Sequence, residues 1–108
     1  MIRGVRVYGP TVTPTPWGPA QTVATIAEGI TSVTTASHGG ILLSEERQAA
    51  MPAHLAGRNI YGGGRWYEED CEWSLVAVAF PEAFPDEQDE ARATLRAYFP
   101  EAARGDAQ

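Results

Sequence analysis

Residues 67–81, YEEDCEWSLVAVAFP, constrain the fold most, because they join the densest acidic cluster of the chain to its most hydrophobic run. Four residues of this stretch follow the i, i+3, i+4, i+7 spacing of one helical face: Trp73, Val76, Ala77 and Phe80. The residues between them make the run nearly apolar all round: Leu75, Val78 and Ala79. The pattern therefore predicts a buried central helix.

Both ends of this predicted helix carry boundary signals. Glu68, Glu69 and Asp70 stand where its first turn would be, and the helix macrodipole favours negative charge there by ~0.3–1 kcal/mol each. Pro81 ends the helix, since proline supplies no N–H and disfavours helix in the residue before it. A period-2 strand is the alternative interpretation, with one face made of Cys71, Trp73, Leu75, Ala77 and Ala79.

The charge of the chain is distributed unevenly. The 108 residues have room for one domain with one core, and a hydrophobic share of 44% predicts a packed globule. Residues 1–66 hold three acids against five arginines, a net charge of +2, whereas residues 67–101 hold ten acids against two arginines, a net charge of −8. Such an acidic half repels phosphate backbones and attracts basic protein surfaces, so we expect no direct nucleic-acid binding.

Cysteine usage and hydropathy exclude several classes of protein. Cys71 is the single cysteine, which excludes an intramolecular disulfide and a cysteine-based zinc cluster, and a small buried side chain is its simplest role. The sequence has no run of ~18 apolar residues and no basic-then-apolar leader, so we expect neither a membrane span nor secretion. The expected location is the host cytoplasm, with no cofactor and no metal.

The N-terminal half predicts strands. Residues 2–8 alternate and indicate a short strand, and the prolines of residues 11–19 predict an extended, irregular arm that Trp17 anchors to the core. A binding platform is the alternative role for Trp17. Three runs rich in Thr, Val and Ile follow at residues 21–26, 30–37 and 41–43, with turns at Glu28-Gly29 and Gly39-Gly40. They predict an antiparallel β-meander, with His38 beside the second turn.

Further helices are predicted on both sides of the central one. Ser44 is an N-cap candidate for a short helix through residue 50, and Pro52 then begins a turn that Gly57 closes. A last helix runs from residue 85 to residue 99, ends at Pro100 and is followed by a frayed tail over residues 101–108. Its face opposite the core carries Asp86, Glu87, Asp89 and Glu90. The predicted fold class is α+β: one domain over residues 1–100, with a three- to four-stranded meander packed against two to three helices.

A catalytic site is one interpretation of the polar residues. His38 could face Glu68, Glu69 or Asp70 across the fold, and such a histidine–carboxylate pair could transfer protons or bind a divalent ion. No HExxH motif and no GxSxG nucleophile elbow accompanies these residues. We therefore assign no catalytic residue and keep this small acid–base or metal-dependent enzyme as the alternative.

A protein-binding face fits the acidic clusters better, since complementary charge speeds association and selects basic grooves. Trp66 and Tyr67 border the first cluster and are candidates for an apolar anchor. The predicted partner-binding residues are Glu68, Glu69, Asp70, Glu72, Asp86, Glu87, Asp89, Glu90, Trp66 and Tyr67.

Four sequence blocks also carry a resemblance. TPWGPAQ at residues 15–21, GITSVTTASHGG at 29–40, RQAAMPAHL at 47–55 and WYEEDCEW at 66–73, followed by the Phe80-Pro81 pair, occur in this order. Over roughly residues 14–100 the chain resembles a small domain of undefined function from phages, conjugative plasmids and integrated elements of high-GC bacteria.

The resemblance implies a setting and no particular catalytic residue. Small acidic proteins of mobile elements often inhibit host defence, as anti-CRISPR and anti-restriction proteins do. We therefore expect a non-enzymatic anti-defence protein, which binds a basic surface of a host CRISPR effector or restriction protein and blocks its access to nucleic acid. An accessory interaction domain of a larger mobile-element protein is a further alternative.

Overall fold

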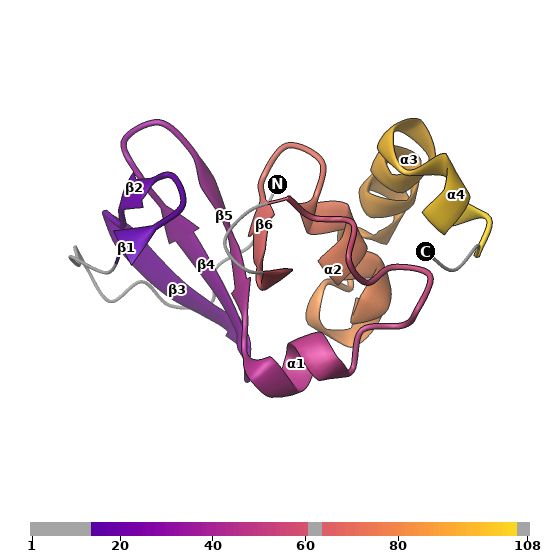
Figure 1. Ribbon diagram of the computed structural model, residues 1–108, viewed down its shortest axis with the longest axis horizontal. Helices are drawn as coiled ribbons and strands as arrows, with labels where there is room; N and C mark the ends of the chain where they lie inside the picture. Colours follow the sequence, from indigo (N-terminus) through magenta and orange to yellow (C-terminus); the bar gives the residue numbers. More distant parts are fainter. Residues whose placement is uncertain (1–13, 61–63, 106–108) are drawn as a thin grey trace.

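The computed structural model describes residues 14–60 and 64–105, and in it a four-stranded antiparallel sheet lies beside a group of helices (Figure 1). The sheet has the order β3-β4-β5-β6, with bounds Thr22–Ala27, Ile30–Thr34, Gly39–Leu43 and Trp66–Glu68. The first three strands form the predicted meander, and β6 adds a fourth. The protein is therefore α+β, as the sequence predicted. The strand predicted over residues 2–8 lies outside the described residues.

One of the two predicted meander turns is correct. Gly29, with a φ of 80°, follows Glu28 between β3 and β4, as expected. The turn predicted at Gly39-Gly40 is wrong, because both glycines belong to β5, where they pair with Thr34 and Val33 of β4. Residues 35–38 make the turn instead. The hydroxyl of Thr35 donates to the His38 carbonyl over 2.7 Å and accepts from the His38 N–H over 3.0 Å, which closes this turn without glycine.

The described part of the predicted irregular arm is a small hairpin. Strands β1 (Pro14–Thr15) and β2 (Gly18–Pro19) pair antiparallel, with Pro14 opposite Pro19. Gly18 adopts a φ of 113°, which other residues rarely adopt, and the Thr15 hydroxyl donates to its carbonyl. Trp17 is thus held at the tip of a hairpin.

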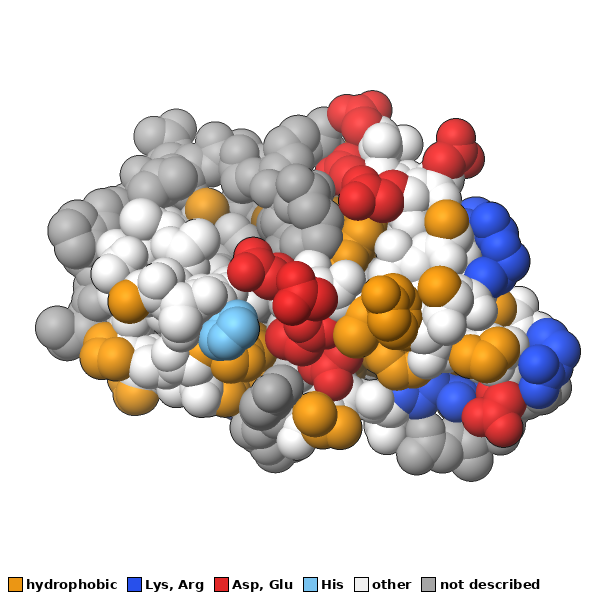
Figure 2. Space-filling view, turned by 90° about the horizontal axis from the view of Figure 1, so that it is seen from above, with side chains coloured by type: hydrophobic (Ala, Val, Ile, Leu, Met, Phe, Trp, Pro, Cys, Tyr) orange, Lys and Arg blue, Asp and Glu red, His pale blue; other side chains and the backbone are white. Residues whose placement is uncertain are grey.

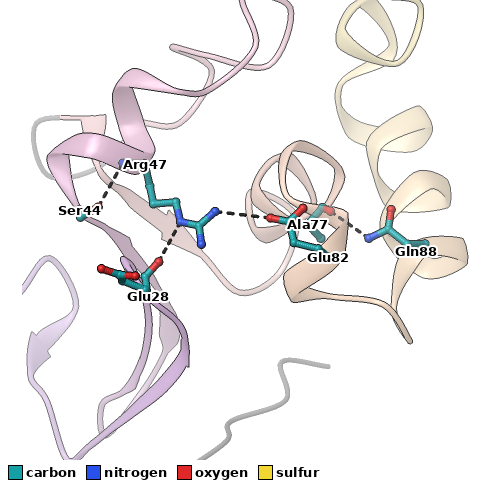
Figure 3. Close-up of polar contacts among 6 residues, drawn as sticks. All are labelled: Glu28, Ser44, Arg47, Ala77, Glu82 and Gln88. Atoms are coloured by element: carbon teal, nitrogen blue, oxygen red, sulfur yellow. Dashed lines mark hydrogen bonds and ion pairs between the residues drawn. The ribbon is translucent and has the colours of Figure 1, made fainter.

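The connection from β5 to β6 contains helix α1 (Glu45–Ala49), which Ser44 caps as predicted, its hydroxyl accepting from the Arg47 N–H at 3.1 Å. Gly57, with a φ of 77°, lies in the turn after Pro52, also as predicted. Arg47 links this connection to both halves of the molecule (Figure 3). Its Nε donates to the Glu28 carbonyl, and its guanidinium lies 4.8 Å from the centre of the Phe80 ring.

The central stretch is not one helix. Trp66–Glu68 form β6, because Tyr67 enters the core opposite Ile41 of β5, and helix α2 begins only at Trp73 and ends at Ala79. The prediction of Glu68, Glu69 and Asp70 in a first helical turn is therefore wrong. The predicted apolar face is buried as expected, since Trp73, Val76, Ala77 and Phe80 all belong to the core.

The C-terminal third is helical. A short 3-10 helix η2 (Pro81–Ala83) leads to α3 (Gln88–Tyr98). The Gln88 side chain joins α3 to α2 by donating to the Ala77 carbonyl (Figure 3), and it also donates to the Phe84 carbonyl. A frayed tail was expected over residues 101–108, but residues 101–103 belong to α4 (Pro100–Ala103), whose Ala102 is buried. Proline is favourable at the first position of a helix, so Pro100 ends α3 and also begins α4.

A single hydrophobic cluster joins the sheet to the helices. Its largest fully buried side chains come from β4, β5, β6, α2 and the segments beside them: Ile30, Ile41, Leu43, Leu55, Tyr67, Trp73, Leu75, Val76 and Phe84. Within residues 14–60 and 64–105, no helix combines the length and the apolar content that crossing a bilayer requires.

Candidate acidic binding site

The loop between β6 and α2, residues 69–72, is built on a carboxylate. Glu68 ends β6, and one of its oxygens, Oε1, accepts the backbone N–H groups of Cys71 and Glu72, both over 2.7 Å. Its second oxygen, Oε2, accepts the Asp70 N–H over 2.8 Å. The carboxylate therefore satisfies donors ahead of α2, which is what negative charge does at a helix start. We call residues 69–72 the acidic loop.

Glu72 completes this arrangement from the other end of the acidic loop. Its side chain is 4% exposed, and its oxygens accept the Glu68 N–H over 3.1 Å and the Ile60 N–H over 3.0 Å. Glu68 and Glu72 thus each bind the backbone of the other. Glu72 was predicted to contact a partner, and its burial shows that this is wrong.

The acidic loop changes the acidity of its own groups. Burial acts to raise the pKa of Glu68, but the hydrogen bonds from Cys71, Glu72 and Asp70 outweigh it and hold this pKa below its usual value. Burial raises the pKa of Glu72, only partly offset by the two N–H groups that it accepts. Burial and the nearby carboxylates raise the pKa of Cys71 to about 12, so this half-buried thiol is not a nucleophile near neutral pH.

Two carboxylates of the acidic loop, those of Glu69 and Asp70, are left for other contacts. Asp70 is exposed at the turn of the acidic loop, and Glu69 is half-buried. The Glu69 N–H donates to the Gly39 carbonyl over 3.1 Å, and its Oε1 lies 3.0 Å from the position that a Cβ on Gly39 would occupy. The start of β5 therefore holds Glu69 in place, while Asp70 faces the solvent.

A second acidic group lies around the start of α3. Asp86, Asp89 and Glu90 are exposed as predicted, whereas Glu87 is 9% exposed and its carboxylate oxygens have no hydrogen-bond partner among residues 14–60 and 64–105. The prediction of Glu87 on the outer face is therefore wrong. Figure 2 shows acidic side chains gathered in two groups on one face of the molecule, with hydrophobic side chains between and beside them.

The two candidate aromatic anchors lie in different places. Tyr67 is fully buried and its hydroxyl donates to Gln48, so the prediction that it is an exposed anchor is wrong, and burial raises its pKa to about 12. Trp66 is half-buried and meets the half-buried Trp17 edge to face, with ring centres 5.7 Å apart and planes at 89°. We call Trp17 and Trp66 the tryptophan pair.

Gly40 explains how the tryptophan pair forms. A Cβ on Gly40 would collide with the Trp17 ring and with the Tyr67 carbonyl, so glycine is required for the hairpin to pack onto the sheet. The sequence offered the TPWGP motif as a signal, but it could not show that Trp17 packs on β5 and reaches Trp66.

His38 lies close to the acidic loop. It directly precedes Gly39, which the Glu69 carboxylate contacts, so the turn before β5 brings a histidine and a carboxylate to the same corner. Among the described residues, no three His, Cys, Asp or Glu side chains are placed to hold a metal ion.

Arg47 lies beside a pocket at the opposite end of β5. The pocket has a volume of about 530 Å³ and is lined by Glu28, Gly29, Ser44, Glu46 and Arg47. The Arg47 guanidinium also forms an ion pair with Glu82 over 3.5 Å (Figure 3). Because Arg47 is already paired with Glu82, and Glu28 and Glu46 are among the described lining residues, the pocket is a poor receptor for an anion.

Residues 10–105 match the family described as a domain of unknown function, DUF7007. The chain belongs to this family. The match covers every element of the DUF7007 domain described above, including the acidic loop and the tryptophan pair. Comparison with curated proteins and with solved structures gives no match.

Proposed function

We propose that this DUF7007 domain is a non-enzymatic binding protein that uses its exposed carboxylates to engage a basic, nucleic-acid-binding surface of a partner protein. The acidic loop carries this proposal. Glu68 accepts the N–H groups of three loop residues and Glu72 accepts those of Glu68 and Ile60, so that Glu69 and Asp70 are presented on a backbone that is already ordered. Charges held in this way lose little conformational freedom on binding.

The second acidic group adds further exposed carboxylates. Asp86, Asp89 and Glu90 are exposed around the start of α3, and residues 67–101 carry ten acids against two arginines. In the mobile-element setting that the sequence resemblance implies, the partner is a host CRISPR effector or a restriction protein. A domain bound over its basic groove would exclude nucleic acid by competing for the same arginines and lysines.

Charge reversal in the acidic loop tests this function. The variant Glu69→Lys/Asp70→Lys leaves Glu68 and Glu72 in place, and the matched control Glu45→Lys/Glu46→Lys changes the net charge equally on α1. Both are assayed for inhibition of CRISPR interference and of restriction across a panel of effectors. We expect the loop variant to lose inhibition and the α1 control to keep it.

The salt dependence of association provides a second readout once an effector is identified. Exposed charges are screened over ~8 Å at physiological ionic strength, so the association rate of the wild type should fall as salt is added. Absence of inhibition across the whole panel would contradict the anti-defence function. Equal inhibition by both charge variants would remove the acidic loop from the mechanism.

An acid–base enzyme is the second candidate, because His38 directly precedes Gly39, which the Glu69 carboxylate contacts where β5 begins. A proton-transfer pair of this kind requires hydrogen-bond distance or one intervening water. Under this alternative, His38→Gln would abolish the biological effect while leaving any complex with the partner intact. Under the binding function, inhibition should follow complex formation in every variant.

A further inference from the structure

Three buried oxygen atoms at the junction of α2 and α3 lack a hydrogen-bond donor within residues 14–60 and 64–105. They are both carboxylate oxygens of Glu87 and the amide oxygen of Gln88, and all three are shielded from solvent. Buried polar groups are nearly always hydrogen-bonded, and an exception of this kind indicates a bound water or ion, or a functional role. Because the two residues are consecutive, the three oxygens belong to one short stretch at the start of α3.

The backbone around this stretch fixes the Gln88 amide. Gln88 is the first residue of α3, and its side-chain nitrogen donates to the carbonyl of Ala77, in the last turn of α2, over 2.9 Å (Figure 3). The same nitrogen donates to the Phe84 carbonyl over 3.0 Å, and the Glu87 backbone N–H donates to this carbonyl over 3.3 Å. The amide nitrogen is thus fully used, while the oxygen of the same planar group is left to accept.

Glu87 lies on the core side of α3. Glu87, Ala91 and Leu95 follow the i, i+4, i+8 spacing of one helical face, and Ala91 and Leu95 belong to the hydrophobic core. Within the described chain, the Glu87 side chain makes no capping hydrogen bond at the start of the helix. Its charge is therefore removed from water without described backbone donors of the kind that Glu68 has, which is costly for an ionised carboxylate.

We propose that Glu87 and Gln88 form a buried binding site for a monovalent alkali-metal cation, Na⁺ or K⁺. The site oxygens come from a carboxylate and a neutral amide, and such hard donors suit alkali and alkaline-earth cations better than transition metals. Sites for Zn²⁺ and Ca²⁺ usually combine several charged side chains, and the described part of the chain has no such group of three. This inference is independent of the proposed function.

Charge selects a monovalent ion. Glu87 supplies one negative charge, which a monovalent cation neutralises, whereas a divalent cation would leave a positive charge buried. The helix dipoles favour the same arrangement, because the start of α3 favours the negative charge of Glu87 and the C-terminal end of α2, where Ala77 lies, favours a cation. In transporters, backbone carbonyls and helix C-terminal ends coordinate Na⁺ in this way.

Thermal unfolding of the full chain in NaCl, KCl and choline chloride tests the site. The three salts are used at equal concentration, so the ionic strength is the same, and choline is a monovalent cation too large to enter between two packed helices. A cation that raises the ratio of folded to unfolded protein about fivefold shifts the midpoint of a domain of this size by about 4–8 °C. We expect a midpoint higher by about this amount in NaCl or KCl than in choline chloride.

Two variants locate the effect. Glu87→Gln removes the charge at nearly the same shape, and Glu90→Gln removes an exposed charge in the same turn. The difference between the salts should vanish in Glu87→Gln and persist in Glu90→Gln. Equal midpoints of the wild type in all three salts would overturn the cation site. A difference that persists in Glu87→Gln would also overturn it, because the cation would then bind elsewhere.

Hydrogen–deuterium exchange of the wild type covers the case in which Glu87→Gln fails to fold. Peptides that span residues 77–91 contain the junction, whereas peptides that span residues 22–34 contain β3 and β4 and serve as the internal control. The junction peptides should exchange more slowly in NaCl or KCl than in choline chloride, by a larger factor than the control peptides. The same factor in both regions would overturn a cation site at the junction.

Discussion

The two acidic groups of this protein look alike in the sequence and differ in the structure. In the first, Glu68 and Glu72 accept five backbone N–H bonds between them and so form the frame of the acidic loop. In the second, Glu87 is buried at the start of α3, and its carboxylate oxygens accept no hydrogen bond from the described part of the chain. A cluster of acids is therefore not one kind of feature, because the role of each carboxylate depends on the donors that the backbone brings to it.

The difference between the two acidic groups should affect the free energy of unfolding. A carboxylate that accepts two or three N–H groups replaces the water it loses, whereas a buried carboxylate with no partner does not. Glu68, whose three N–H donors outweigh its burial, should therefore stabilise the fold, and Glu87 should destabilise it. The exposed acids of both groups should contribute little to stability, which leaves them available for a partner.

The largest effect is expected from Glu68→Ala. This change leaves the N–H groups of Asp70, Cys71 and Glu72 without their acceptor, and we expect a loss of about 1–3 kcal/mol in the free energy of unfolding. The control Asp89→Ala removes an exposed acid of the second group and should change this free energy by no more than about 0.5 kcal/mol. Urea denaturation measures both. Equal losses in the two variants would contradict the contrast between the groups.

A smaller effect of opposite sign is expected from Glu87→Met. Replacing an unpartnered buried carboxylate with an apolar side chain of similar length should raise the free energy of unfolding by about 1 kcal/mol. Glu90→Met, at an exposed position in the same turn of α3, should leave it nearly unchanged. Thermal unfolding monitored by circular dichroism measures both variants. A lower unfolding midpoint for Glu87→Met than for the wild type would mean that the Glu87 carboxylate makes a stabilising interaction in solution.

The smallest effect is on the pH dependence of stability. The pKa of Glu68 is lowered on folding, so its contribution is present above the usual carboxyl pKa and is lost as the pH falls through the folded value. The pKa of Glu72 is raised, so its contribution is present below the usual carboxyl pKa and is lost as the pH rises through the folded value. The drop in stability between about pH 6 and pH 3 should therefore become smaller in Glu68→Gln and larger in Glu72→Gln, by denaturation at each pH. The same change in both variants would refute the opposed roles.

Local sequence signals predicted several elements correctly. The Thr- and Val-rich runs predicted β3 and β4, Ser44 predicted the start of α1, and the apolar face of residues 73–80 predicted what the core contains. Each of these depends on interactions between residues close in the chain or on a periodic apolar pattern, so a single sequence is sufficient to predict them.

The acidic start of the predicted central helix shows what such local sequence signals fail to predict. The macrodipole argument correctly expected negative charge ahead of a helix, but pairing with β5 drew residues 66–68 into the sheet and delayed α2 to Trp73. The sequence predicted that the candidate site is acidic, but it did not predict which of the acids are exposed. Asp70, Asp86, Asp89 and Glu90 are exposed, whereas Glu72 and Glu87 are buried.

The sequence by itself determined the α+β class, the acidic character of the second half and the residues that make the core, because these follow from composition and periodicity. Only the tertiary structure decided which acids build the acidic loop, which acid is buried alone and which tryptophan meets Trp66. Those outcomes depend on contacts between distant segments: Gly40 admits Trp17, Ile60 donates to Glu72, and β5 pairs with β6. Such contacts are set by packing and strand register, which local sequence patterns do not encode.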